Sequence, residues 1–225
     1  METPEQPVQP QSPATPAMAP AAGMDITPTA SEVTYPAYPL QFDVGYRQEY
    51  SRWLPLVKWL LAIPHWFVLT FVGIGAFFGI VAAWFMVLVT GRYPEGIFKF
   101  LVGAWRWSLR VMAYQLLLVD EYPPFSLDDD PDYPVRFNVD YPPEGKIARW
   151  RIFFAWVPVI PQLFIASWAL FAAYIGIVVA FFSILFTKRF PRGIFDFVVN
   201  TMRFQNRAGA YAYWLTERYP GFAWG

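Results

Sequence analysis

Two long apolar stretches decide the fold of this chain: WLLAIPHWFVLTFVGIGAFFGIVAAWFMVLVT at residues 59–90 and IFFAWVPVIPQLFIASWALFAAYIGIVVAFFSILFT at residues 152–187. The first contains a single titratable side chain, His65, and the second contains none. Apolar stretches longer than roughly 18 residues are typical of membrane helices. The sequence therefore predicts an all-α integral membrane protein with minor β structure.

Each stretch is too long for one straight helix across a bilayer. Single helices would be about 48 and 54 Å long, whereas the hydrocarbon core is roughly 30 Å thick. Both stretches contain an Ile-Pro step, Ile63-Pro64 and Ile160-Pro161, which disfavours helix at the residue before the proline. We expect each stretch to bend into a helical hairpin. The alternative is one tilted span per stretch, from His65 to Thr90 in the first, with the helix that follows recrossing the bilayer.

Basic residues flank both ends of each apolar stretch. A hairpin would bring both ends to one side, which the positive-inside rule predicts to be cytoplasmic. A single tilted span would instead leave one basic cluster outside. The flanking residues are Arg47, Arg52, Lys58, Arg92 and Lys99 in the first case and Lys146, Arg149, Arg151, Lys188, Arg189 and Arg192 in the second.

The chain contains an internal duplication. Residues 52–125 align with residues 149–222 without a gap, at an offset of 97 and with 29 identities over 74 positions. Upstream, YPLQFDV at 38–44 matches YPVRFNV at 133–139 at an offset of 95. Both heptads alternate apolar and polar residues as a half-buried strand does. We expect two short strands that pair outside the bilayer.

A further helix follows each apolar stretch, from Pro94 to Val119 and from Pro191 to Thr216. Its polar residues recur at helical spacing along one narrow stripe, and arginine at the bilayer centre is penalised by at least about 2.5 kcal/mol. We therefore expect two amphipathic helices at the interface. Guanidinium groups beside a phenol can hold a phosphate, so lipid headgroups are candidate ligands; nonspecific headgroup contact and pairing with the acidic linker are the alternatives. The candidate residues are Arg106, Arg110, Tyr114, Arg203, Arg207 and Tyr211.

Small residues in the apolar stretches predict close helix packing. Gly75 and Gly79 have the four-residue spacing that lets helices approach closely, and Ala172 and Gly176 lie at the same places in the second copy. His65 is matched by Gln162, so a polar anchor is a better interpretation than a proton relay.

The composition excludes most chemistry. The chain has 225 residues, one His and no Cys, and no catalytic constellation, metal site or cofactor motif emerges from it. Seventeen Lys and Arg balance 17 Asp and Glu, but the acids gather in the first 36 residues and at 120–132. The rest is basic beside apolar segments, which favours anionic lipid over nucleic acid as a partner. We divide the chain into a disordered Pro/Ala-rich tail (1–36), membrane repeat 1 (37–125), an acidic linker (126–132) and membrane repeat 2 (133–222).

Three motifs resemble one protein family. They are TGRYPEGIFKF at 90–100, TKRFPRGIFDF at 187–197 and RWSLRVMAYQLLLVDEYPPF at 106–125. They resemble an uncharacterised bacterial membrane protein family of the actinobacterial type, domain of unknown function four-three-eight-nine, here present as a tandem repeat. The resemblance implies an integral membrane protein and carries no activity or ligand. Asn200, Gln205 and Asn206 depart from the pattern in the second copy.

These observations predict a multi-pass protein of the cytoplasmic (plasma) membrane. We expect a non-enzymatic accessory or scaffold protein that binds anionic headgroups and also a membrane complex or a second copy of itself. The alternative is a small transporter or channel with a pathway at the repeat interface. The absence of charges within the apolar stretches weighs against an ion path.

Overall fold

The computed structural model describes residues 24–25, 38–222 and 224. The predicted disordered tail lies outside these residues except for Met24–Asp25, which form strand β1 and pair with β3 (Tyr46–Arg47). The described part of the chain is mostly helical and contains two repeats, as predicted.

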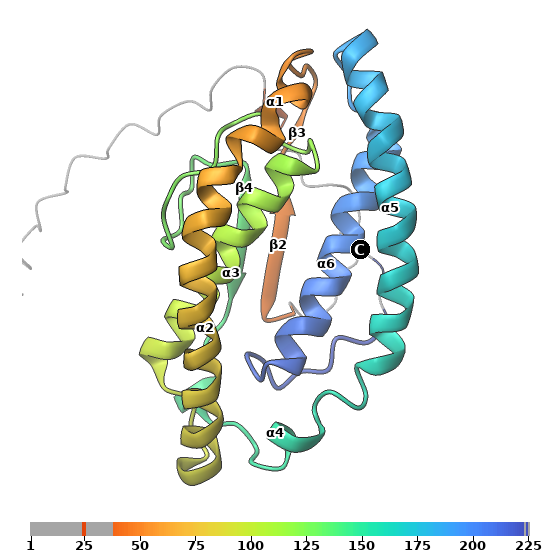
Figure 1. Ribbon diagram of the computed structural model, residues 1–225. Helices are drawn as coiled ribbons and strands as arrows, with labels where there is room; N and C mark the ends of the chain where they lie inside the picture. Colours follow the sequence, from red (N-terminus) through yellow and green to blue (C-terminus); the bar gives the residue numbers. More distant parts are fainter. Residues whose placement is uncertain (1–23, 26–37, 223, 225) are drawn as a thin grey trace, which may run out of the picture.

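Each repeat consists of a short strand, a long apolar helix and a second, amphipathic helix (Figure 1). The first repeat contains β2 (Leu40–Val44), β3, α1 (Leu54–Leu61), α2 (Ile63–Thr90) and α3 (Glu95–Gln115). The second contains β4 (Val135–Val139), the 3-10 turn η1 (Pro143–Gly145), α4 (Arg151–Phe154), α5 (Ile160–Thr187) and α6 (Arg192–Ala212).

The predicted hairpins are wrong, because the break in each apolar stretch lies near its start, just before Ile63 and Ile160, and one helix without a turn fills the rest. Helices α2 and α5 each run through 28 residues, or about 42 Å. The prolines do not break them, because Pro64 and Pro161 lie in the first turn of each helix, where the missing N–H has no intrahelical acceptor. The single-helix alternative describes this part of the chain correctly.

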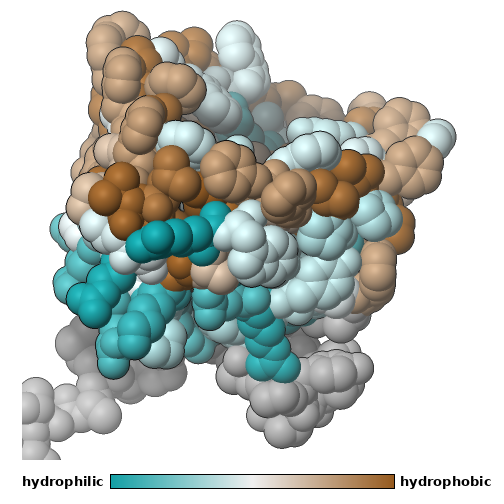
Figure 2. Space-filling model, turned by 90° about the horizontal axis from the view of Figure 1, so that it is seen from below, coloured by the Kyte–Doolittle hydropathy of each residue, from teal (hydrophilic) through white to brown (hydrophobic). Residues whose placement is uncertain are grey.

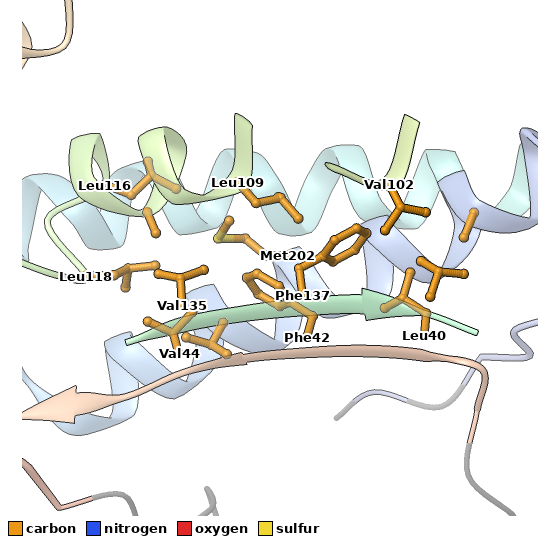
Figure 3. Close-up of a cluster of buried hydrophobic side chains, with 14 of the residues drawn as sticks. Leu40, Phe42, Val44, Val102, Leu109, Leu116, Leu118, Val135, Phe137 and Met202 are labelled. Carbon is orange, nitrogen blue, oxygen red and sulfur yellow. The ribbon is translucent and has the colours of Figure 1, made fainter. Parts of the chain in front are cut away.

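Strands β2 and β4 form an antiparallel pair, and Figure 3 shows their buried side chains pointing toward α3. Phe42 lies opposite Phe137, and the inward side chains of both strands are buried against the helices. The repeats exchange partners in this layer: β4 packs on α3 and β2 packs on α6. The predicted pairing of the two strands is therefore confirmed.

An approximate twofold axis relates the repeats and makes α2 and α5 antiparallel (Figure 1). The Tyr50 amide, before α1, donates to the Lys188 carbonyl at the end of α5 (2.8 Å). The Ile147 amide, before α4, donates to the Gly91 carbonyl at the end of α2 (3.0 Å). These bonds are equivalent at the offset of 97 residues, and the axis passes between Phe42 and Phe137.

Small residues of the long helices lie close to the side chains of neighbouring helices. The space beside Gly79 is filled by Leu101 of α3, and a Cβ on Gly176 would lie only 2.8 Å from Ile194 Cγ2 of α6. Gly75 faces Phe100 in the same way. Ala172 is exposed, and the adjacent Ala173 is buried instead. The prediction for Ala172 was wrong by one residue.

The outer sides of α2 and α5 are apolar and exposed. Phe71, Phe78 and Phe85 of α2 are each more than half exposed, as are Phe164, Phe171 and Val178 of α5. Figure 2 shows apolar residues on two lobes, where α2 and α5 run, with a hollow between them and hydrophilic residues on the opposite side. The fold therefore has three layers: the strand pair, the amphipathic helices and the apolar helices.

Candidate functional site

Arg106 and Arg203 cap the two outer edges of the strand pair. The Nε of Arg106 donates to the Phe137 carbonyl (2.8 Å), and the Nε of Arg203 donates to the Phe42 carbonyl (3.0 Å). Antiparallel pairs alternate between hydrogen-bonded and non-hydrogen-bonded positions. The bonds from Gly45 to Pro134 and from Asp140 to Pro39 make Phe42–Phe137 a non-hydrogen-bonded pair, so these carbonyls point away from the partner strand. Each arginine therefore supplies the hydrogen-bond donor that a neighbouring strand would supply in a larger sheet.

The two arginines differ in their further partners. Arg106 also donates to the Leu127 carbonyl (2.9 Å) and lies 3.6 Å from Asp129 of the acidic linker. Arg203 is instead held by Asn200 Oδ1 (2.8 Å). Asp43, 3.5 Å from Arg203, corresponds to Asn138, whose Oδ1 accepts a hydrogen bond from Arg106 (3.3 Å).

The polar residues that distinguish the second copy have separate uses. Asn200 orients Arg203, as described above. Asn206 accepts a hydrogen bond from Trp105 Nε1 (2.9 Å) and thereby joins α6 to α3. Gln205 is exposed. The two copies are therefore not equivalent in their internal polar contacts.

Arg110 and Arg207 each lie against a tyrosine that precedes a strand. The guanidinium carbon is 5.6 Å from the ring centroid of Tyr133 for Arg110 and of Tyr38 for Arg207. Arg110 is fully buried and donates to the Asp128 carbonyl (3.0 Å). Burial raises the pKa of both phenols above the usual range and lowers the pKa of both guanidinium groups.

The predicted phenol partners, Tyr114 and Tyr211, face different cations. Lys58 Nζ lies 4.9 Å from the Tyr114 ring and donates to the Val119 carbonyl (2.6 Å) and to Asp120 Oδ1 (2.8 Å). Arg151 lies 4.4 Å from the Tyr211 ring and donates to the Thr216 carbonyl (2.9 Å). In the sequence, Lys58 and Arg151 are recognisable only as charges that flank the apolar stretches.

A signal for this exchange is visible in the repeat alignment. Lys58 aligns with Ala155, and Arg151 aligns with Leu54. The two positions are four residues apart, on one helical face. Each copy therefore has one cation, but at different positions of the same helical face. This pattern predicts that both cations contact the equivalent tyrosine inside their own repeat.

The predicted headgroup residues thus line the interior of the molecule. Arg106, Arg110 and Tyr114 are at most 8% exposed, and the two arginines contact backbone carbonyls, the acidic linker and, for Arg106, the Asn138 side chain. This burial favours pairing with the linker, an alternative considered above, over headgroup binding at these positions.

Six exposed cations lie at the two ends of the long helices. The start of α1 adjoins the end of α5, and the end of α2 adjoins the segment before α4. Two basic clusters result, related by the twofold axis. The exposed residues are Arg52, Lys188 and Arg189 in end cluster 1 and Arg92, Lys146 and Arg149 in end cluster 2.

His65 and Gln162 occupy equivalent buried positions. His65 Nδ1 accepts a hydrogen bond from Trp107 Nε1 (3.1 Å), and its ring stacks on Phe125 at a centroid distance of 3.9 Å. Gln162 donates through Nε2 to the Gly221 carbonyl. Both side chains fix a long helix to the segment after the amphipathic helix, which agrees with a polar anchor.

Among the residues that the structure describes, no group of three or more His, Asp and Glu side chains could hold a metal ion. Residues 54–90 and 160–187 form helices long and apolar enough to cross a membrane.

Comparisons with known proteins identify one family. A family model described as Domain of unknown function (DUF4389) matches residues 53–126 and 149–223, more than half of the chain. No curated protein and no solved structure matches. The two matched segments correspond to the two copies of the internal duplication.

Proposed function

The chain belongs to the DUF4389 family and contains its domain twice, and we propose that it is a non-enzymatic membrane protein anchored through the apolar sides of α2 and α5. The observation that carries this proposal is the exposure of these helices, since so many large apolar side chains facing outward on one side mark a membrane or protein contact. Their low content of charge makes lipid the better partner.

The layer order suggests how the protein lies in the membrane. The twofold axis is perpendicular to the strand pair, so it is parallel to the bilayer normal when α2 and α5 face the lipid together. Both end clusters then lie at the same depth, beside the headgroups. By the positive-inside rule, we expect the end clusters to lie on the cytoplasmic side. The exposed residues Gln41, Arg136 and Asn138 of the strand pair then face the cytoplasm, where a partner protein can reach them.

A multi-pass arrangement would be less favourable for this fold. If α2 and α5 crossed the bilayer, the strand pair beside them would lie at hydrocarbon depth together with exposed Arg136 and the acidic linker. Charged side chains and irregular segments that face lipid are strongly disfavoured there. Helices about 42 Å long would also need a tilt of about 44° to match a hydrocarbon core of roughly 30 Å. We therefore place both helices along one leaflet.

Cysteine labelling distinguishes the two arrangements, because the chain has no cysteine of its own. Single variants Arg92→Cys and Lys188→Cys place a thiol at opposite ends of the molecule. We expect a membrane-impermeant maleimide to leave both unlabelled in intact cells and to label both after disruption of the membrane.

Asp130→Cys, in the linker, should behave like these two variants. If only one of the two end positions is labelled from outside, the helices cross the bilayer. The two repeats would then have opposite orientations in the membrane, as in many transporters. Recovery of the full chain in a high-speed supernatant without detergent would contradict the membrane proposal itself.

Anionic lipid is the second element of the proposed function. A basic residue near an anionic surface contributes about 1 kcal/mol to binding. Replacing Arg52, Lys188 and Arg189 with Gln should therefore weaken the salt-sensitive part of binding to phosphatidylglycerol vesicles by on the order of a hundredfold or more, measured by vesicle flotation. Arg136→Gln, on the water-facing side, is the control and should bind like the wild type. Equal binding of the triple variant would exclude end cluster 1 as a headgroup site.

A further inference from the structure

The two repeats differ in one apolar cavity. Between α2 and α3 lies a cavity of about 240 Å³, whose lining includes Gly73, Ala76, Leu101 and Trp105 of these helices and also Tyr213 and Leu215, which follow α6. The equivalent space between α5 and α6 has a volume of only about 10 Å³. The difference is large, although the surrounding backbone follows the same plan.

Gly73 explains much of this difference. It aligns with Leu170, whose side chain lines the closed space of the second repeat. A Cβ on Gly73 would meet no atom within 4 Å. Glycine within a helix is unfavourable by about 1 kcal/mol relative to alanine, so local helix stability does not account for a glycine here.

The lining favours an apolar ligand. Two of its polar groups are already engaged: Ser108 Oγ donates to the Ala104 carbonyl (2.8 Å), and Trp105 Nε1 donates to Asn206 (2.9 Å). The rest of the lining is mostly aliphatic. Gly73 is exposed on α2, and Val72 and Ala76 beside it are half-buried, so the cavity is continuous with the apolar side of that helix.

We propose that this cavity holds an acyl chain of a membrane lipid, with Gly73 as its entrance. The proposal rests on the proposed membrane location, since it takes the ligand from the bilayer that α2 faces. An engineered cavity of about 150 Å³ in another protein binds benzene, so a cavity of about 240 Å³ is large enough for several methylene groups. The second repeat binds no chain, because Leu170 occupies the corresponding space. The protein would thus hold one lipid on one side of its twofold axis.

The test uses vesicles of phosphatidylglycerol that carries a photoreactive diazirine on one acyl chain. In the wild type we expect crosslinks to residues 101–108 inside the cavity, mapped by mass spectrometry. Gly73→Leu should reduce these crosslinks by at least about tenfold, because displacing roughly two methylene groups is sufficient for that factor. Ile74→Leu, at the next and exposed position, is the matched control. Leu170→Gly should produce new crosslinks at residues 198–205.

Exposed Phe77 and Phe78 report on the membrane location separately. Their crosslinking should be the same in all four proteins. If they are labelled while residues 101–108 are not, or if Gly73→Leu leaves the cavity crosslinks unchanged, the acyl-chain site is wrong and the membrane location stands. If Phe77 and Phe78 are also unlabelled, the proposed function fails.

Discussion

The Asp120→Ala variant is expected to lose about 3 to 5 kcal/mol of unfolding free energy, the range found when one partner of a buried ion pair is removed. Lys58 and Asp120 form such a pair, with N–O distance 2.8 Å and side-chain exposures of 2% and 9%. The variant leaves the lysine ammonium buried with only the Val119 carbonyl as a hydrogen-bond acceptor. The same change removes the acceptor of the Ser51 amide (2.7 Å).

Thermal unfolding in detergent micelles provides the measurement. For a chain of this size, a loss of 1 kcal/mol lowers the melting temperature by about 2 to 4 °C, so a decrease of about 10 °C is expected. Adding Lys58→Met to Asp120→Ala should recover most of the loss, because it removes the unpaired charge.

The second repeat provides a matched control at the equivalent position. Glu217 accepts a hydrogen bond from the Ala148 amide (3.2 Å) as Asp120 does from Ser51, but its side chain is exposed. Ala155 stands where the first repeat has Lys58. Glu217→Ala should therefore lower stability by less than about 1 kcal/mol. Equal losses in the two variants, or no recovery in the double variant, would show that the buried charge is not the cause.

The repeat-level pattern of the chain could be predicted from sequence. The duplication determined where equivalent elements would lie, and the alternating heptads at 38–44 and 133–139 predicted two strands that do pair. The strands align at an offset of 95 residues and the helices at 97. This change shows that the segment between each strand and its helices differs in length between the two copies. Gly75 and Gly79 lie where Phe100 and Leu101 of α3 approach the first long helix.

Long-range contacts account for what the sequence did not reveal. The continuity of α2 depended on whether Pro64 ended one helix or began another, and the Ile-Pro step alone does not distinguish these cases. Arg110 meets Tyr133, and Arg207 meets Tyr38, because each strand packs under the amphipathic helix of the other repeat. Such exchange has no periodic signature within either repeat, so helical spacing alone points to the nearer phenols, Tyr114 and Tyr211.

Replacing the edge-capping arginines should weaken the contact between the repeats. Arg106→Met leaves the Phe137 carbonyl without its donor, and Arg203→Met does the same to Phe42. A hydrogen bond to a charged group contributes about 1.5 to 3 kcal/mol. We expect Arg203→Met to lower the free energy of unfolding by about 2 kcal/mol. The loss should be larger for Arg106→Met, since Arg106 is more buried and also donates to the Leu127 carbonyl.

Hydrogen exchange can separate this effect from general loss of stability. Because each arginine belongs to one repeat and caps the strand of the other, β2 and β4 amides should exchange faster in both variants, while amides in the middle of α2 and α5 change little. Arg106→Lys should recover only part of the effect, since an ammonium cannot reproduce the forked geometry that reaches two carbonyls. Arg136→Met, on the exposed side of β4, is the control. If Arg106→Met exchanges like Arg136→Met, the strand edges are protected by packing alone, and the two repeats are held together by their shared apolar core.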